Sequence, residues 1–392
     1  MTPDFTPIAA LLQTDAYKLD HRRQYGLSGN VTRVYSNFTN RKSRLPGVDH
    51  VVHFGLQAYI QKHLVEAFEP FFASSGNHVA ALYEQRVAQI LGPDAAAAIG
   101  SDHIRDLWSM GYLPLRFCAV PEGTLVPIRV PSFTVENSHP DFAWLTNYIE
   151  TGLSAGYWQA STSATIAHEY RKVLDAAAER TGAPRAAVDW QCHDFSYRGM
   201  SSHETAALSG AAHLLSFTGT DSLVALDWIE RYYGGHYIVG SVPATEHSVM
   251  CTGIATAGEL ETFERLLDLY PTGIVSVVSD TFDLWRVLTE YLPALNDKIM
   301  SRDGKLVIRP DSGDPLKILC GDPQAAAGSP AHRGVVGLLF DQFGGTENDA
   351  GFMELDPCVG AIYGDSITID RANAITSKLA LMGFASTTVV FG

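Results

Sequence analysis

Residues 305–315 read Lys-Leu-Val-Ile-Arg-Pro-Asp-Ser-Gly-Asp-Pro, and this stretch decides the fold that we expect for the 392-residue chain. The apolar run Leu306–Ile308 predicts a short buried strand that leads directly into a cation and two carboxylates. Pro310 and Pro315 cannot donate to a hydrogen-bonded ladder, so the strand should end there. Polar groups of both signs at the end of a buried strand are typical of the face where α/β enzymes carry their chemistry.

The same pattern occurs twice more in the sequence. Residues 275–280 read Val-Ser-Val-Val-Ser-Asp, and residues 360–365 read Gly-Ala-Ile-Tyr-Gly-Asp. We expect the three strands to deliver Asp280, Asp311 and Asp365 to one rim, with Arg309 beside them. Such charges are costly to bury unless they are paired or bound to a ligand, and mutual ion pairing is the simpler interpretation. No phosphate-binding P-loop, G-x-G-x-x-G or H-E-x-x-H motif occurs in the sequence.

Alternating strand and helix patterns from about residue 188 predict parallel strands covered by helices. The simplest arrangement is an irregular (β/α) barrel, and an open doubly wound sheet is the alternative. We expect an N-terminal α/β domain over residues 1–150 and the barrel over residues 151–392. Expected strands are 33–38, 188–195, 214–217, 274–278, 306–308, 361–363 and 386–391, with a hairpin at 122–131. Expected helices are 51–67, 144–153, 162–180, one that begins at 202, one after 221 that runs through 233, 282–292 and 371–382. Residues 321–351 read as an irregular insertion or as a short helix flanked by loops.

Composition excludes several classes of protein. The chain is 46% hydrophobic and 18% charged, as expected for a globular protein. Its net charge of −15 disfavours binding to nucleic acid or to an anionic membrane, so an anionic substrate would need a local cationic pocket. Five scattered cysteines disfavour disulfides and structural zinc and favour a reducing cytoplasm. We find no pattern of a signal peptide or a membrane span.

Three further segments carry candidate residues with a structural alternative. Arg198 follows a predicted strand and has the geometry to grip phosphate, but the sequence does not favour this over a surface role. Ser201-x-x-Glu204 reads as a capping box, so we do not expect Glu204 to be catalytic. Asp221 precedes a predicted helix, where an N-cap is the favoured interpretation. His247 lies at a loop-to-helix transition beside Glu246, a neighbour that would raise its basicity.

Taken together, these segments resemble the nicotinamide phosphoribosyltransferases of the type II phosphoribosyltransferase family. The resemblance covers nearly the whole chain. It is carried by 14–18 (Thr-Asp-Ala-Tyr-Lys), Arg41, 193–199 (His-Asp-Phe-Ser-Tyr-Arg-Gly), 201–206, 219–221 (Gly-Thr-Asp), 241–248 (Ser-Val-Pro-Ala-Thr-Glu-His-Ser), 276–280, 309–313 (Arg-Pro-Asp-Ser-Gly) and 364–365 (Gly-Asp).

The resemblance implies the type II barrel with an N-terminal α/β domain, and transfer of the phosphoribosyl group of phosphoribosyl pyrophosphate (PRPP) to nicotinamide. It implies a homodimer in which Asp15 and Tyr17 reach the other subunit's site, where Tyr17 and Phe195 sandwich the pyridine ring. Asp221 would then accept a hydrogen bond from the carboxamide, which favours nicotinamide over nicotinate. Arg41 is implied as another substrate-binding residue.

The remaining roles also follow from the resemblance. Arg309 would lie beside the ring and the phosphates, Arg198 would contact pyrophosphate, and Asp311, Gly364 and Asp365 would hold the ribose. His247 would be phosphorylated by ATP, and we group it with Arg309 and Asp311 as catalytic. Mg²⁺ would bind chiefly through pyrophosphate. Asp280 is expected to bind substrate but has no assigned role.

Some alternatives stay open. A nicotinate phosphoribosyltransferase is the nearest, a non-catalytic relative that holds nicotinamide or a partner is another, and a metal-dependent barrel hydrolase using Asp280 and Asp365 is the third. In the family a glycine-rich phosphate-binding loop follows the segment that matches Val389–Gly392. We therefore expect the sequence to be a C-terminally truncated piece of a longer chain.

Overall fold

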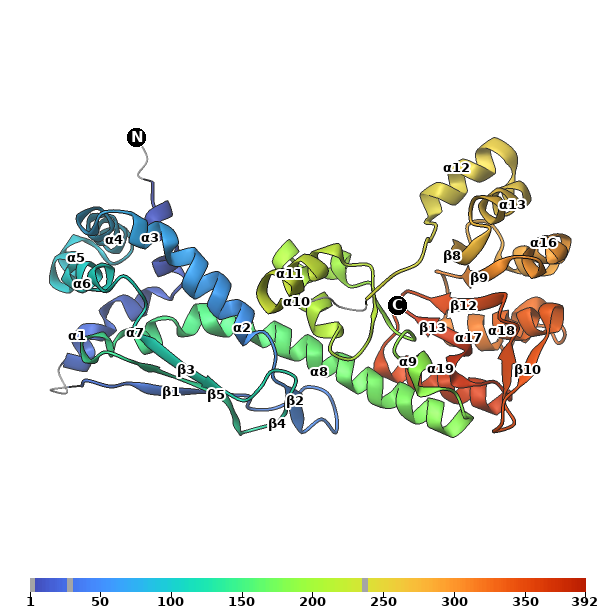
Figure 1. The fold of residues 1–392 in the computed structure, drawn as a ribbon, viewed down its shortest axis with the longest axis horizontal. Helices are drawn as coiled ribbons and strands as arrows, with labels where there is room; N and C mark the ends of the chain where they lie inside the picture. Colours follow the sequence, from blue (N-terminus) through green and yellow to red (C-terminus); the bar gives the residue numbers. More distant parts are fainter. Residues whose placement is uncertain (1–3, 27–30, 235–238) are drawn as a thin grey trace. The chain divides into compact units, whose positions relative to one another are not determined.

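The computed structural model describes residues 4–26, 31–234 and 239–392. The chain forms two compact units, one of Met1–Thr165 with Leu226–Gly235 and the other of Ile166–Ala225 with His236–Gly392. Residue 150, the expected boundary, begins helix α8 (Glu150–Thr181), whereas the two units divide inside this helix, between Thr165 and Ile166 (Figure 1). This helix is continuous, whereas the sequence predicted separate helices at 144–153 and 162–180.

The first unit contains two small antiparallel sheets. Strands β1 (Tyr35–Thr39), β5 (Pro131–Asn137) and β3 (Leu115–Ala119) pair in the order β1-β5-β3, and β2 (His50–Val52) pairs with β4 (Leu125–Pro127). Its helices are η1 (Thr6–Leu12), η2 (Ala16–Asp20), α1 (His21–Gly26), α2 (Leu56–Tyr59), η3 (Ile60–Val65), η4 (Glu66–Phe68), α3 (Glu69–Ala73), α4 (Gly76–Leu91), α5 (Pro93–Ile99), α6 (Asp102–Met110), η5 (Pro140–Phe142) and α7 (Leu145–Tyr148).

Two sequence predictions for this unit were wrong. The hairpin expected at 122–131 does not form, because β4 pairs with β2 while β5 pairs with β1 and β3. A turn in which Val130 N donates to Pro127 O, with Arg129 at φ 72°, redirects the chain between them. The helix expected from residue 51 begins only at Leu56, since the preceding residues form β2 and the chain turns at Gly55.

The second unit is a closed barrel of parallel strands. Four of them, in the order β13-β12-β9-β8, are β13 (Val389–Phe391), β12 (Val359–Tyr363), β9 (Asp303–Arg309) and β8 (Thr272–Val278). Strands β6 (His193–Asp194) and β7 (Gly219–Thr220) form a second parallel pair. Three parallel bridges complete the ring: Cys192 to Phe391, Gly219 to Gly240, and Ala244 to Ser276.

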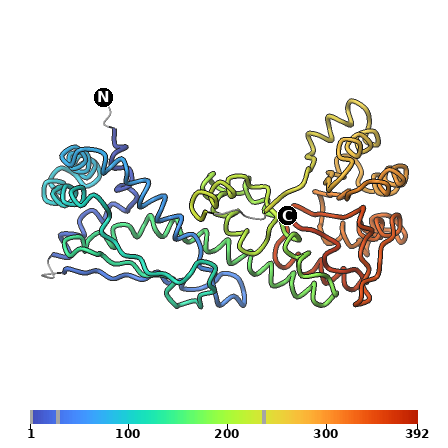
Figure 2. Tube along the Cα trace, viewed as in Figure 1, coloured from blue at the N-terminus to red at the C-terminus, as the bar shows by residue number. Residues whose placement is uncertain are grey.

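The closed ring confirms the predicted irregular (β/α) barrel and contradicts the open-sheet alternative. Figure 2 traces the backbone of this unit along the chain. The remaining elements of this unit are α9 (Arg185–Val188), η6 (Tyr197–Gly199), α10 (His203–His213), α12 (His247–Ala257), α13 (Glu259–Leu269), α14 (Leu284–Arg286), η7 (Val287–Tyr291), α15 (Leu292–Ala294), α16 (Asn296–Met300), α17 (Pro315–Cys320), α18 (Pro330–Phe343), β10 (Gly345–Glu347), β11 (Met353–Leu355), α19 (Ile369–Leu381) and η8 (Ser386–Thr388). Helix α11 (Leu223–Tyr233) has residues in both units.

Local predictions in the barrel were partly wrong. The strand expected at 214–217 is a turn that ends α10, in which Phe217 N donates to His213 O, and pairing starts only at Gly219. The strand expected at 188–195 is reduced to His193–Asp194, after helix α9. In 321–351 the second of the two interpretations is confirmed as to the helix, because α18 forms there after a loop.

The barrel core lies between the strands and their helices. Val275, Val277, Leu306 and Ile308 are fully buried in one hydrophobic cluster with residues of the helices. Because successive side chains of a strand point to opposite faces, the intervening residues, Arg309 included, point into the barrel. Among the residues that the structure describes, no helix is both long and apolar enough to span a membrane.

Candidate functional site

The barrel strands end at the residues that the sequence singled out. Parallel strands place their carboxyl ends on one rim, where (β/α) barrels carry their sites. In chain order, β6 is followed by Phe195, β7 by Asp221, the bridged segment 240–245 by His247, β8 by Asp280, β9 by Asp311, and β12 by Gly364 and Asp365.

His247 is the first residue of α12 and lies between two carboxylates of the rim. Its Nε2 is 3.4 Å from Asp280 Oδ1, and its Nδ1 is 4.0 Å from Asp311 Oδ2. Glu246, which the sequence suggested as the basic neighbour, instead accepts a hydrogen bond from Ser248 Oγ. The carboxylates that hold His247 are therefore those of Asp280 and Asp311, because the rim, not chain adjacency, sets its surroundings.

Asp280 connects the two neighbouring strand ends. Its side chain is only 8% exposed, against 47% for His247. Its Oδ2 accepts the backbone N–H of Asp311 at 2.9 Å, and its buried Oδ1 has no hydrogen-bond partner among the described residues. A buried acceptor without a partner is costly, so Oδ1 is placed to accept a hydrogen bond from His247 Nε2. The structure thus suggests an orienting role for a residue that the sequence left unassigned.

Tyr363 is a rim residue that sequence reasoning missed. Its ring is buried and its hydroxyl donates to Gly313 O at 3.1 Å. Burial, and then the charges of Asp280, Asp365 and Asp311, raise the pKa of Tyr363 to about 12. The hydroxyl therefore stays protonated and holds the loop that follows β9. A tyrosine directly before Gly-Asp at a strand end was the available signal.

Phe195, Arg309 and Gly364 form a compact wall. The guanidinium carbon of Arg309 lies 5.4 Å from the centroid of the Phe195 ring. A Cβ on Gly364 would lie 2.8 Å from the same ring, so only glycine fits there without a shift. Arg309 Nη2 is 3.7 Å from Asp311 Oδ1, while its buried Nε has no hydrogen-bond partner in the described part of the chain. The ion pair alone therefore leaves Arg309 unsatisfied, which favours a ligand.

Asp221 is exposed at the end of β7. Helix α11 begins at Leu223, so Ser222 and not Asp221 occupies the residue before it, and the N-cap interpretation was wrong. The Asp221 carboxylate accepts a hydrogen bond from Ser241 Oγ. Burial lowers the pKa of nearby His193, and the Asp221 charge opposes that shift. An exposed carboxylate beside a neutral imidazole can accept a hydrogen bond from a substrate.

The capping box before α10 lies one residue later than expected. Ser202 Oγ accepts from Thr205 N, and Thr205 Oγ1 accepts from Ser202 N, so Ser201 and Glu204 do not form it. Arg198 is exposed in η6 and forms no ion pair with any described residue. Its guanidinium is accordingly available to an anion.

Asp15, Tyr17 and Arg41 lie in the first unit, whereas the rim belongs to the second. Asp15 Oδ2 accepts from Thr151 Oγ1 at 2.6 Å. Tyr17 is 61% exposed. Arg41 is exposed in the loop between β1 and β2. The adjacent Lys18 is buried and donates to Asn147 O at 2.9 Å, which fixes the turn that carries Asp15 and Tyr17.

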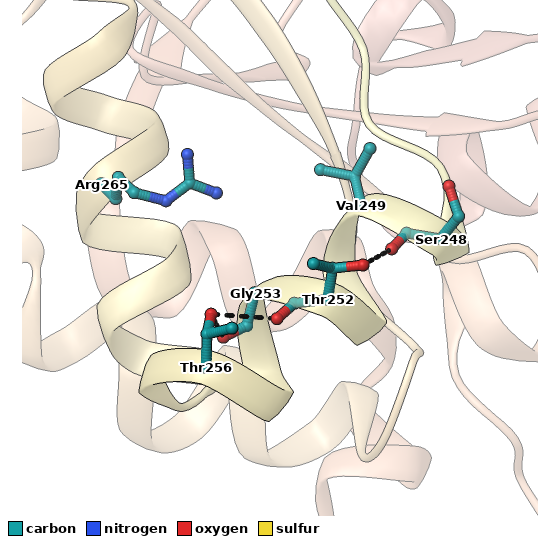
Figure 3. A pocket seen from close by; sticks show the side chains of 6 residues that line it. All are labelled: Ser248, Val249, Thr252, Gly253, Thr256 and Arg265. Carbon is teal, nitrogen blue, oxygen red and sulfur yellow. Dashed lines mark hydrogen bonds between the residues drawn. The ribbon is translucent and has the colours of Figure 1, made fainter.

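Helices α12 and α13 line an open pocket (Figure 3). It has a volume of about 490 Å³ and is lined by Ser248, Val249, Thr252, Gly253, Thr256 and Arg265. Thr252 Oγ1 donates to Ser248 O at 2.8 Å, and Thr256 Oγ1 donates to Thr252 O at 3.0 Å. Both hydroxyls already donate to carbonyl groups of their own helix, and Arg265 is the charged side chain of the pocket lining. Within the described residues no group of three His, Cys, Asp or Glu side chains could hold a metal ion.

Comparison with known proteins identifies the family. Residues 190–392 match the nicotinate phosphoribosyltransferase (NAPRTase) family, and residues 9–68 match the nicotinamide phosphoribosyltransferase N-terminal domain. A nicotinamide phosphoribosyltransferase of Acinetobacter baylyi is 50% identical over 392 residues, which cover 96% of this chain and 76% of that protein. The chain belongs to the nicotinate phosphoribosyltransferase family.

Further relatives support the same assignment within this phosphoribosyltransferase family. A nicotinamide phosphoribosyltransferase of Mycoplasma pneumoniae is 33% identical over 99% of this chain and 85% of its own length. The barrel fold is shared with human nicotinic acid phosphoribosyltransferase (TM-score 0.58, 18% identity, 97% of this chain and 72% of that one). It is also shared with nicotinate-nucleotide pyrophosphorylase of Pyrococcus furiosus (TM-score 0.54, 15% identity, 100% and 73%). The resemblance seen in the sequence is confirmed.

Proposed function

We propose that this phosphoribosyltransferase transfers the phosphoribosyl group of PRPP to nicotinamide in NAD salvage, giving nicotinamide mononucleotide and pyrophosphate. The observation that carries the proposal is the wall of the rim, where the half-buried Phe195 ring lies against Gly364 and below the Arg309 guanidinium. An aromatic face with an unsatisfied donor beside it suits a flat pyridine ring that reacts next to an anionic leaving group, the pyrophosphate of PRPP. The 50% identity to a nicotinamide phosphoribosyltransferase supports this choice of reaction.

Asp221 gives the proposed preference for nicotinamide. Its exposed carboxylate, steadied by Ser241, would accept a hydrogen bond from the carboxamide NH₂. The carboxylate of nicotinate would be repelled at the same position. We propose that Tyr17 of a second subunit covers the other face of the ring and that Asp15 accompanies it. This makes the active enzyme a homodimer, which we expect in the cytoplasm, and Arg41 is proposed to bind substrate.

The chemical step requires little proton transfer. The pyridine nitrogen attacks the anomeric carbon with its own lone pair, the bond from that carbon to the pyrophosphate oxygen breaks, and pyrophosphate leaves with the electron pair. Asp311 and Asp365, with Gly364, would hold the ribose and stabilise the positive charge that develops on it. Arg309 and Arg198 would receive the phosphates. Mg²⁺ would be held mainly by the pyrophosphate oxygens and would neutralise their charge.

We propose that ATP phosphorylates His247. An imidazole nitrogen attacks the γ-phosphorus and ADP leaves. Water later attacks the phosphohistidine and releases inorganic phosphate, so that ATP hydrolysis is coupled to product formation. Asp280, 3.4 Å from Nε2, would orient the ring for attack. His247→Ala should abolish ATP stimulation and leave basal synthesis, measured as product formed with and without ATP. His78→Ala, at an exposed position of the first unit, is the control. Stimulation that survives in His247→Ala would exclude this role.

The decisive experiment measures nicotinamide mononucleotide formed from nicotinamide, PRPP and Mg²⁺, with nicotinate as the competing substrate. We expect nicotinamide to be the better substrate. Faster turnover of nicotinate would make the protein a nicotinate phosphoribosyltransferase. Binding of nicotinamide without turnover, in the presence of PRPP and ATP, would indicate a non-catalytic relative. Hydrolysis of PRPP without pyridine transfer would favour a hydrolase.

A further inference from the structure

The turn after β12 contains a residue in an unfavourable backbone conformation. Ser366 has φ 53°, and within the described residues only Arg129 shares a positive φ without being glycine. The left-handed region crowds the Cβ of an L-residue, so such a conformation persists only where surrounding contacts enforce it. Ser366 follows Gly364 and Asp365 directly, which places the strained residue at the rim.

Side chains from two helices hold this turn. Arg371, in the first turn of α19, donates from Nη1 to Ser366 O at 2.6 Å and to Ser366 Oγ at 2.7 Å. Tyr170, on α8, donates its hydroxyl to Ile367 O at 2.6 Å. Burial raises the pKa of Tyr170 to about 12, so the hydroxyl remains a donor at neutral pH. Two consecutive carbonyl groups are thus fixed from two sides.

The contacts of Arg371 are unusual for an exposed cation. It forms no ion pair with a carboxylate in the part of the chain that the structure describes, and its guanidinium hydrogen bonds go to the neutral Ser366. Thr368, the N-cap of α19, accepts from Arg371 N at 3.2 Å and ties the helix start to the same turn. The guanidinium therefore holds the backbone of the turn and does not neutralise a carboxylate among the described residues.

The turn matters because of what its first residue touches. A Cβ on Gly364 would lie 2.8 Å from the Phe195 ring and 3.7 Å from Arg309 Nη2. Gly364 is packed directly against the Phe195 ring, so a shift of the turn would change the wall that Phe195, Arg309 and Gly364 form. Sub-ångström displacements of positioning groups are enough to weaken substrate binding or turnover.

We propose that Arg371 and Tyr170 are positioning residues that hold the 364–367 turn in the conformation that receives the phosphoribosyl group. We call these contacts of Arg371 and Tyr170 with residues 366 and 367 the clamp. Ser366 makes the clamp necessary, because a glycine there would adopt the same φ without being held by other side chains. This inference rests on the proposed function, since it concerns the binding of PRPP at that rim.

The test is a double-mutant cycle on the purified enzyme, read as KM for PRPP and kcat separately. Arg371→Ala should raise KM for PRPP about three- to tenfold with kcat changed less than about twofold, because it removes two charge-assisted bonds that position the turn. Arg371→Lys keeps the charge, but its shorter side chain does not place a donor where Nη1 of Arg371 lies, so it should behave similarly. In a Ser366→Gly background, the effect of Arg371→Ala should shrink.

Lys378→Ala is the matched control, because Lys378 is another exposed cation of α19. Its KM for PRPP should stay at the wild-type value. An equal rise in Lys378→Ala, or full rescue by Arg371→Lys, would assign the effect to charge alone and overturn the proposal. An Arg371→Ala effect that is undiminished by Ser366→Gly would also overturn it. Failure of the wild-type enzyme to use PRPP at all would instead reject the proposed function.

Tyr170→Phe provides a second and independent arm. It removes one hydroxyl from a side chain that keeps its packing, so the protein should remain folded. We expect KM for PRPP to rise about two- to fivefold, less than for Arg371→Ala, because one bond is lost and not two. An unchanged KM would remove Tyr170 from the proposed clamp.

Discussion

The barrel rim and the Asp15–Lys18 turn of the first unit present candidate residues in different ways. At the rim, residues far apart in sequence hold one another: Asp280 accepts from Asp311 N and faces His247. In the turn, the anchor is Lys18, which is buried and bonded to Asn147 O and to Glu150 Oε2, while Tyr17 is 61% exposed. The rim residues contact one another, whereas in the turn the buried Lys18 fixes the backbone and leaves the Tyr17 side chain exposed.

The difference teaches which residues can be judged from one chain. A rim residue has partners whose distances can be read, so its role can be argued from those contacts. Tyr17 and Arg41 are exposed, so their function depends on what they meet in the assembled enzyme. Variants in the two regions should therefore have different effects. Substitutions at the rim should lower kcat/KM, whereas substitution of Lys18 should lower the free energy of unfolding and weaken substrate binding.

The largest expected effect is at the rim. Arg309→Ala removes the cation that lies over the Phe195 ring. The buried Nε of this arginine has no hydrogen-bond partner among the residues that the structure describes. We expect kcat/KM to fall about 10²–10³-fold, as for loss of one charge-stabilising donor. Steady-state assays with PRPP and nicotinamide measure this. Arg286→Ala, at an exposed arginine paired with Glu290, is the control. A fall of less than about tenfold would mean that the rim does not act as one connected unit.

A smaller effect should appear in substrate choice. Asp221→Asn removes the charge that repels nicotinate and keeps a side chain of the same size. The ratio of kcat/KM for nicotinamide to that for nicotinate should fall about 10- to 100-fold. Competition between the two pyridines for limiting PRPP gives this ratio directly. The Asp227→Asn variant, on helix α11, serves as the charge-matched control. Unchanged discrimination would contradict the role of Asp221.

The anchor of the first unit should show the other kind of failure. Lys18→Met keeps the buried length of the side chain but loses its donors to Asn147 O and Glu150. We expect the free energy of unfolding to fall by about 1–3 kcal/mol, with a few-fold rise in KM for nicotinamide. Urea unfolding and steady-state kinetics give both values. Lys172→Met, at an exposed lysine paired with Glu169, should change neither. Lost catalysis at unchanged stability would break the distinction between the two regions.

The smallest expected effect concerns pH and the core of the first unit. His103 is buried against Tyr83 and Trp144, and burial lowers its pKa from 6.5 to about 3. Between these values the unfolded chain binds a proton that the folded chain does not. Stability therefore falls as pH drops below 6.5 and is unaffected by this group above it.

His103→Phe should remove that contribution and keep a buried ring. Between pH 6 and pH 5 the wild type should lose roughly 1 kcal/mol more stability than the variant. Urea unfolding at pH 7.5, 6 and 5 provides the comparison, with His78→Phe at an exposed position as the control. Parallel pH profiles for wild type and His103→Phe would show that this histidine does not titrate on unfolding.

Strand positions were predictable where the apolar run was uninterrupted. Strands β8, β9 and β12 form around the predicted segments 274–278, 306–308 and 361–363, although each begins two or three residues earlier than expected. The segment 214–217 (Leu-Leu-Ser-Phe) has three apolar residues but forms the turn after α10, because so short an apolar run fits a turn over the core as well as a strand. The closure of the ring through isolated bridges had no sequence signal, since it depends on single residue pairs.

By itself, the sequence determined the alternating β–loop–α order, the family and the polar residues that end the strands. These depend on local patterns and on residue types that can be read along the chain. Only the tertiary structure decided which polar groups meet: that Asp280 rather than Glu246 faces His247, that Ser222 rather than Asp221 precedes α11, and that Arg371 holds Ser366. The physical reason is that partners across a barrel rim are set by strand register and burial, which bring together residues that no spacing in the sequence relates.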